Sequence, residues 1–241
     1  MARFRTARRR AHVLRYGQDP ELVVRLRLAH VLWLLGRPGE AARHRDLALA
    51  AAEESTHPYS RAVVSAWAAI LAMDRGDAAE LRRHVQALGR HAAADAPAQL
   101  SWAARAFTGH VALLEGRTAA GLARVREVRE QVMGGRAPAP GVPGVATRLL
   151  LQSYAIAGEP QAGLALADEA LGMGCGAELW EAEIRRLRAT FLAELGAPAG
   201  EVTAGLERAL TVARRQQARA FEERIRGTLT ERSLSHGGAH P

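Results

Sequence analysis

Histidines and carboxylates are the residues of this chain most able to do chemistry, and their spacing limits what they can do. His84 and His91 lie seven residues apart, which places both on one side of a helix. No H-E-x-x-H motif or cysteine pair accompanies them, so the ligand set of a zinc site is missing. Glu181 and Glu183 lie roughly 200° apart round a helix, which makes them a poor pair for acid–base catalysis. We predict no metal site and no catalytic site, and we expect the neighbouring Trp180 to be a core side chain.

A glycine-rich stretch, Gly172–Gly176 (GMGCG), contains the single cysteine of the chain, Cys175. A dinucleotide-binding glycine pattern lies between a strand and a helix, whereas this stretch joins two predicted helices, so we interpret it as a linker. A reactive thiol at Cys175 is the alternative, although no histidine or arginine is evidently paired with it. A phosphate-binding loop needs a lysine, and the chain has none. We therefore predict no cofactor and no enzyme activity.

The arginines give the chain a formal net charge of +8. Lysine and asparagine, which both use A-rich codons, are absent from the sequence, so a GC-rich genome can explain the arginine surplus. Nucleic-acid binding through arginines remains an alternative, above all for the N-terminal cluster Arg3, Arg5, Arg8, Arg9 and Arg10. No apolar run approaches the roughly 20 residues needed to span a bilayer, and no signal peptide is evident. We expect a cytoplasmic location and no membrane partner.

The elements that position these side chains are marked by a recurring turn. An apolar segment ends at a glycine, and an alanine-rich segment follows, as in LLGRPGEA around Gly36. The same pattern returns four times, at intervals of 40, 40, 42 and 38 residues, at Gly76, Gly116, Gly158 and Gly196. Glycine suits the residue after a helix end because it adopts the left-handed conformation without a Cβ clash. Five occurrences at nearly one spacing indicate an array of helix pairs.

Apolar residues in four of the segments before these glycines recur at the period of a helix that is buried on one side. We predict an all-α fold, a right-handed α-α superhelix of about five helix pairs with a period near 40 residues. The pairs are expected at 20–54, 58–94, 97–133, 145–173 and 177–217, with a last helix near 218–233. The expected core stripes are Val24, Leu28, Val31, Leu32 and Leu35; Val63, Trp67, Ile70 and Leu71; Leu100, Ala104, Phe107, Val111 and Leu114; and Trp180, Ile184, Leu187, Phe191 and Leu195.

The chain is expected to divide into one large domain with short flanks. Residues 16–233 form the repeat domain, interrupted by a Gly/Pro-rich connector at 134–144. Residues 1–15 are interpreted as a basic helix end or the remnant of a preceding repeat, and residues 234–241 as a disordered tail.

A small residue about five positions after the turn glycine, as at Ala41, Gly121 and Gly163, is typical of tetratricopeptide repeats, so the array is predicted to be a tetratricopeptide-like solenoid with lengthened helices. Four blocks also resemble, in order, the helical C-terminal region of large bacterial signalling ATPases: Tyr16–Ala41, His57–Leu71, Glu178–Gly196 and Ala213–Arg224. Such ATPases are joined to class III adenylate/guanylate cyclase domains or to LuxR-type or other DNA-binding domains. The resemblance implies a regulatory role. It does not imply ATPase or cyclase activity, because the chain lacks the residues for either reaction.

We therefore expect a non-catalytic scaffold that binds a protein or peptide partner on a concave surface lined by the first helix of each pair. By the resemblance, the expected partner is an ATPase, a cyclase or a DNA-binding regulator. An alternative is the regulatory subunit or fragment of a split ATPase or nucleotide cyclase, and a second alternative is nucleic-acid binding. The candidate partner-binding side chains are Arg25, Arg61, Arg105, Arg148, Gln152 and Arg185, whose arginines suggest an acidic partner.

Overall fold

The computed structural model describes residues 19–55, 57–92, 98–136, 142–173 and 178–237. Within these ranges the chain is almost entirely helical and contains no strand, which confirms the all-α prediction. Contacts between Cα atoms divide the chain into two units, Met1–Trp33 with Arg37–Val111, and Leu34–Gly36 with Ala112–Pro241. Residues 16–233, expected to form one domain, are thus shared between two units. The expected segment 1–15 and Cys175 lie outside the described residues.

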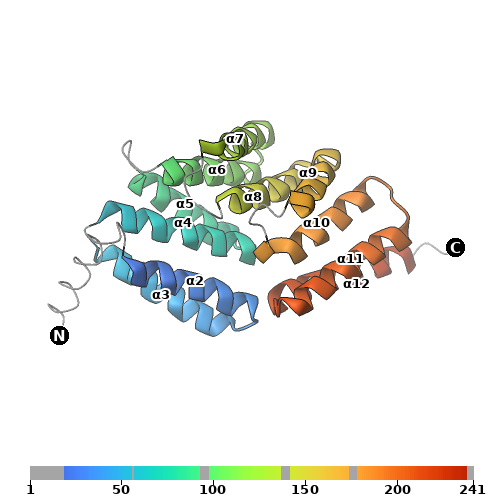
Figure 1. Cartoon of the computed structure of the whole chain (residues 1–241), viewed down its shortest axis with the longest axis horizontal. Helices are drawn as coiled ribbons and strands as arrows, with labels where there is room; N and C mark the ends of the chain where they lie inside the picture. Colours follow the sequence, from blue (N-terminus) through green and yellow to red (C-terminus); the bar gives the residue numbers. More distant parts are fainter. Residues whose placement is uncertain (1–18, 56, 93–97, 137–141, 174–177, 238–241) are drawn as a thin grey trace. The chain divides into compact units, whose positions relative to one another are not determined.

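Helices that follow each other in the chain pack together, as Figure 1 shows for α4 with α5 and for α10 with α11. The first unit contains α2 (Pro20–Leu34), α3 (Pro38–Glu53), α4 (Pro58–Arg75), α5 (Ala78–His91) and most of α6 (Ala98–Leu114). The second unit contains α7 (Thr118–Gln131), η1 (Val132–Arg136), α8 (Val142–Ala157), α9 (Pro160–Met173), η2 (Glu178–Trp180), α10 (Glu181–Glu194), α11 (Ala199–Arg215) and α12 (Arg219–Gly237).

The turn inside each helix pair has a glycine in the left-handed conformation. Its φ angle is 74° at Gly36, 72° at Gly76, 83° at Gly116, 69° at Gly158 and 80° at Gly196. After Gly76, the carboxylate of Asp77 accepts a hydrogen bond from the backbone N–H of Glu80 and so caps α5. α3 and α9 begin instead with Pro38 and Pro160, whose fixed φ suits the first helical turn. Short-range backbone chemistry therefore sets where the helices stop and restart.

Two boundaries differ from the expected ones. α8 begins at Val142, inside the expected connector 134–144, because Pro143 is tolerated in a first helical turn. At the other end of the connector, η1 runs to Arg136, with Gly135 at a φ of 79°. α12 continues to Gly237, although a disordered tail is expected from residue 234.

The expected core stripe of α2 is wrong for three of its five residues, whereas Leu32 is buried as expected. Val24, Leu28 and Val31 are 61%, 39% and 46% exposed. The opposite side of the helix, which includes Leu22, Leu26 and Ala29, is buried, and the two leucines form a core cluster with Ala48, Ala52, Val64 and Ala68 of α3 and α4. Nearly every side of α2 carries apolar residues, so the sequence period alone fits two registers, and packing against α3 and α4 selects one.

The other expected stripes agree with the observed burial over most of their length. Val63, Ile70 and Leu71 are buried in α4, and Leu100, Phe107 and Val111 are buried in α6. Trp180, Ile184, Leu187 and Phe191 are buried at α10. Two stripes end in a residue that is more than a third exposed and lies near the turn: Leu114 in α6 and Leu195 after α10.

Small residues allow α9 and α10 to approach closely. A Cβ atom added at Gly163 of α9 would lie only 2.4 Å from the ring of Phe191 on α10, and this ring is fully buried. Gly163 follows its turn glycine by five residues, the position at which the repeat pattern calls for a small side chain. Ala41 and Gly121 at the equivalent position are also buried.

We predict that Gly163→Ala lowers the free energy of unfolding by about 1–3 kcal/mol, because the new methyl group must displace the Phe191 ring in a packed interior. The matched control is Gly227→Ala in α12, where an added Cβ meets no atom within 4 Å. This control should raise stability by roughly 0.5–1 kcal/mol through helix propensity. Equal urea midpoints for wild type and Gly163→Ala would contradict the close approach of the two helices.

Candidate functional site

Two of the six predicted partner-binding residues are partly exposed arginines held by ion pairs within their own helices. Arg25 contacts Glu21 at 2.7 Å, and Arg185 contacts Glu181 at 2.9 Å. The side chains of both arginines are 32% exposed, so each guanidinium remains open to a ligand on one side. Arg61 and Arg105 are half-buried. Burial and, after it, the charge of Arg61 lower the pKa of His91 in the same unit.

Arg148 differs from the prediction, because its side chain is fully buried in the second unit and is not open to a partner. It is one of three arginines that surround the carboxylate of Glu183, whose side chain is 1% exposed. The side-chain amide oxygen of Gln152, one helical turn after Arg148, accepts from both Nη atoms of Arg148 at 3.0 and 3.2 Å. Arg148 and Gln152 therefore belong to an interior polar cluster.

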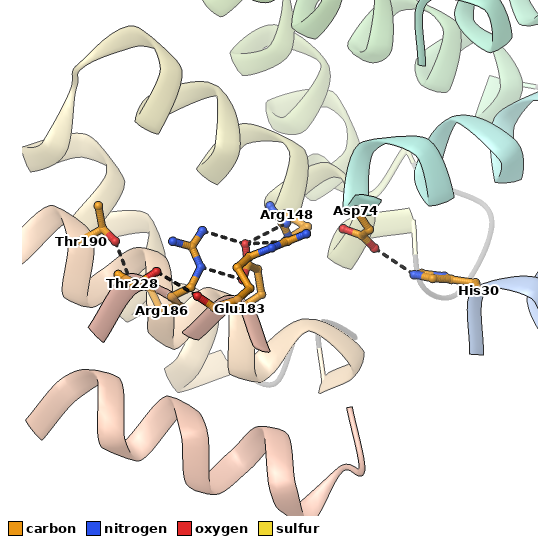
Figure 2. Close-up of polar contacts among 8 residues, drawn as sticks. His30, Asp74, Arg148, Glu183, Arg186, Thr190 and Thr228 are labelled. Atoms are coloured by element: carbon orange, nitrogen blue, oxygen red, sulfur yellow. Dashed lines mark hydrogen bonds and ion pairs between the residues drawn. The ribbon is translucent and has the colours of Figure 1, made fainter. Parts of the chain in front are cut away.

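This cluster joins three helices of the second unit, and Figure 2 shows Arg148 and Arg186 converging on Glu183. Arg186 on α10 binds both carboxylate oxygens of Glu183 at 2.8 Å, through Nε and Nη2. Nη1 of Arg224 on α12 donates to Oε1 at 3.0 Å, and Nη2 of Arg148 on α8 lies 3.4 Å from the same oxygen. A buried carboxylate is stable only when it is paired in this way.

The electrostatics of the cluster depend on the balance between burial and the arginines. Burial alone raises the pKa of Glu183, but Arg186, Arg148 and Arg224 outweigh it and lower the pKa to about 2. Burial lowers the pKa of Arg186, but its interactions with Glu183 outweigh this effect and raise that pKa. Glu183 is therefore ionised at neutral pH. Because Glu183 is enclosed, its ion pairs hold α8, α10 and α12 together and leave no exposed reactive group.

A second buried polar contact lies in the first unit, between α2 and α4. His30 Nε2 and Asp74 Oδ2 are 2.9 Å apart, and their side chains are 5% and 0% exposed (Figure 2). The backbone N–H of Asp19, the residue before α2, also donates to Ser60 Oγ of α4. These contacts fix how α2 packs on α4.

The histidines considered as metal ligands lie among arginines and carboxylates. The Glu80 carboxylate contacts Arg75 at 2.6 Å and Arg45 at 2.9 Å, and it lies 3.7 Å from His84 Nε2. Burial is the main cause that lowers the pKa of His84. Among the described residues, no group of three or more histidine, cysteine, aspartate or glutamate side chains could hold a metal ion. Nor does any helix in the described part of the chain combine the length and apolar character needed to cross a membrane.

Val24, Leu28 and Val31, which were expected in the core, form an exposed apolar row on α2 that we call the α2 ridge. Each ridge residue follows a buried residue by two positions and so lies about 200° round the helix from it. The guanidinium of Arg27, which stacks over the ring of Trp67 at 4.2 Å, flanks one side of the ridge, and Arg25 flanks the other. α2 is thus apolar on two opposite sides, and only one of them is packed.

Sequence reasoning missed the partners of Glu183 as well as the α2 ridge. The pair Glu183–Arg186 has a local signal, because residues three apart face the same side of a helix. Arg148 and Arg224 are 35 and 41 residues away in the chain, and no local pattern connects them to Glu183.

We predict that Glu183 makes the stability of the protein depend on pH. Its pKa is about 2 in the folded state against an ordinary value of 4.5. Its ion pairs therefore contribute fully above about pH 5, and the contribution is lost as the pH falls toward 2. Wild type should lose on the order of 3 kcal/mol more unfolding free energy over this range than Glu183→Gln, measured by urea denaturation.

The control for this measurement is Glu130→Gln, which changes an exposed glutamate of α7. This variant should follow the wild-type pH profile. Parallel profiles for wild type and Glu183→Gln would show that the Glu183 carboxylate is not held by its arginines.

The comparisons with known proteins gave no match. No protein-family model, no curated protein and no solved structure matches the chain. The resemblance to the helical region of signalling ATPases therefore stays a prediction that rests on the four sequence blocks alone.

Proposed function

We propose that this protein is a non-catalytic scaffold that binds a protein partner. Its helix pairs, joined by left-handed glycine turns at intervals near 40 residues, support a tetratricopeptide-like right-handed superhelix. Such a stack holds its helices rigid, so a partner does not have to order them on binding.

The observation that carries this proposal is the second apolar side of α2. A helix that is apolar all round is ordinarily an interior helix, because each apolar side needs a cover. In α2 one side packs on α3 and α4, whereas Val24, Leu28 and Val31 on the other side remain exposed. The exposed row follows i, i+4 and i+7, the spacing at which one helix packs on another.

The occupant we assign to the α2 ridge is an amphipathic helix of a partner protein, with acidic residues beside its apolar stripe. Arg25 and Arg27 flank the ridge, and carboxylates of the partner can pair with their partly exposed guanidinium groups. The apolar row provides the contact area, and the arginines select a partner of opposite charge.

By resemblance, the cellular role is regulatory, within or beside a signal-transduction ATPase, a nucleotide cyclase or a DNA-binding regulator. An alternative is that this chain is the regulatory subunit or fragment of a split ATPase or nucleotide cyclase. Its partner is then the catalytic part of that enzyme. Nucleic-acid binding is less favoured, because many arginines already pair with carboxylates in the described residues, among them Arg37, Arg45, Arg75 and Arg129.

We predict that the full chain binds a synthetic helical peptide whose leucine stripe is flanked by glutamates, and binds the lysine-flanked version of the same peptide more weakly. Leu28→Asp should raise the Kd for the glutamate-flanked peptide about tenfold or more, because a carboxylate must then lose water inside an apolar contact. Fluorescence anisotropy of the labelled peptides measures both effects.

The matched control is Leu47→Asp on α3, since Leu47 is 46% exposed and Leu28 is 39% exposed. This control should leave the Kd unchanged. Equal binding of the two peptides, or an equal loss in the two variants, would overturn the proposal. A wild-type dimer that Leu28→Asp dissociates in sedimentation would also overturn it, because a second copy would then cover the ridge.

A further inference from the structure

A small hollow in the second unit is lined by three arginines. It has a volume of about 230 Å³, and its walls are Arg185 and Arg188 of α10, Gly205 and Arg208 of α11, and Leu171 of α9. Gly205 allows the close approach that forms it, because a Cβ at this position would lie 3.1 Å from the Cβ of Ala189 on α10. Arg208 lies three residues after Gly205 and so projects from the same side of α11.

The guanidinium groups around the hollow keep free hydrogen-bond donors. Arg185 donates to Glu181 and Arg188 donates to Asp168, in both cases through Nε. Among the described residues, the Nη atoms of these two arginines donate no hydrogen bond, and the Arg208 side chain makes neither a hydrogen bond nor an ion pair. The side chains of Arg185 and Arg188 are 32% and 30% exposed, so solvent reaches both groups.

Three like charges at one hollow repel one another unless anions are present. Arg185 and Arg188 are three residues apart on α10 and therefore face the same side of it. Asp168 pairs with Arg188, and Glu181 is shared between Arg185 and Arg215, so positive charge remains in excess around the hollow. An incoming anion relieves the remaining repulsion, and guanidinium groups bind planar or tetrahedral oxyanions through paired N–H donors.

The geometry points to an anion-binding site in this hollow, which takes a small molecule or chemical group that carries carboxylate or phosphate oxygens. Its volume is smaller than the roughly 300–1,000 Å³ of pockets for drug-sized ligands. The hollow therefore suits a dicarboxylate or a single phosphate group. Leu171 offers an apolar wall for the carbon atoms of such a ligand. An anion held by Arg188 and Arg208 would link α10 to α11.

The test is isothermal titration calorimetry of the full chain with succinate and, separately, with inorganic phosphate, at constant ionic strength. We expect saturable binding of at least one anion at one site per chain. Arg208→Gln should raise its Kd about tenfold through the loss of charge-assisted hydrogen bonds. Arg208 makes no ion pair with another described residue and is exposed, so the variant should fold like wild type. Arg208→Lys should recover only part of the affinity, since lysine keeps the charge but not the paired donors.

The control variant is Arg124→Gln, which removes an exposed arginine of α7 in the same unit. It should leave the Kd unchanged. Binding of succinate alone would assign the site to carboxylates, and binding of phosphate alone would assign it to phosphate groups. The absence of saturable binding for both anions would overturn the inference. An equal loss in Arg124→Gln and Arg208→Gln would also overturn it, because binding would then follow net charge.

Discussion

Most of this structure follows from one constraint: each helix has at least one apolar side and must cover it with its neighbours in the chain. Alanines and glycines make the approach close enough, as where Gly163 of α9 meets the ring of Phe191 on α10. The left-handed glycines then reverse the chain within a few residues, so that the next helix can return along the previous one. Because both steps are local, helices adjacent in the sequence are packed together within each unit.

Apolar packing alone leaves freedom for one helix to slide along another, and we infer that buried polar contacts remove it. Glu183 is stable in the interior only with the guanidinium groups of Arg148, Arg186 and Arg224 around it, which requires one relative position of α8, α10 and α12. His30 and Asp74 impose the same kind of requirement on α2 and α4 in the first unit. In both units the polar contact joins helices that are not consecutive in the chain.

The surfaces left for function are those that the packing does not use, and they differ between the units. In the first unit, α2 keeps a second apolar side between two arginines. In the second unit, arginines of α10 and α11 meet at a hollow with free donors. The first surface suits contact with another helix and the second suits an oxyanion, so the two do not depend on one ligand.

The sequence by itself determined the helical class, the turn glycines and most core stripes, because periodicity and backbone preference act over a few residues. The structure confirms the burial of Trp180, Ile184 and Leu187 on this basis. Only the tertiary structure decided which side of α2 is buried, since that helix is apolar on both sides and its neighbours make the choice. It also decided which arginines are interior and which are open. Arg148 and Arg185 are chemically identical, but Arg148 is enclosed and Arg185 lines a hollow. Residues some 20 to 40 positions away in the chain determine this difference.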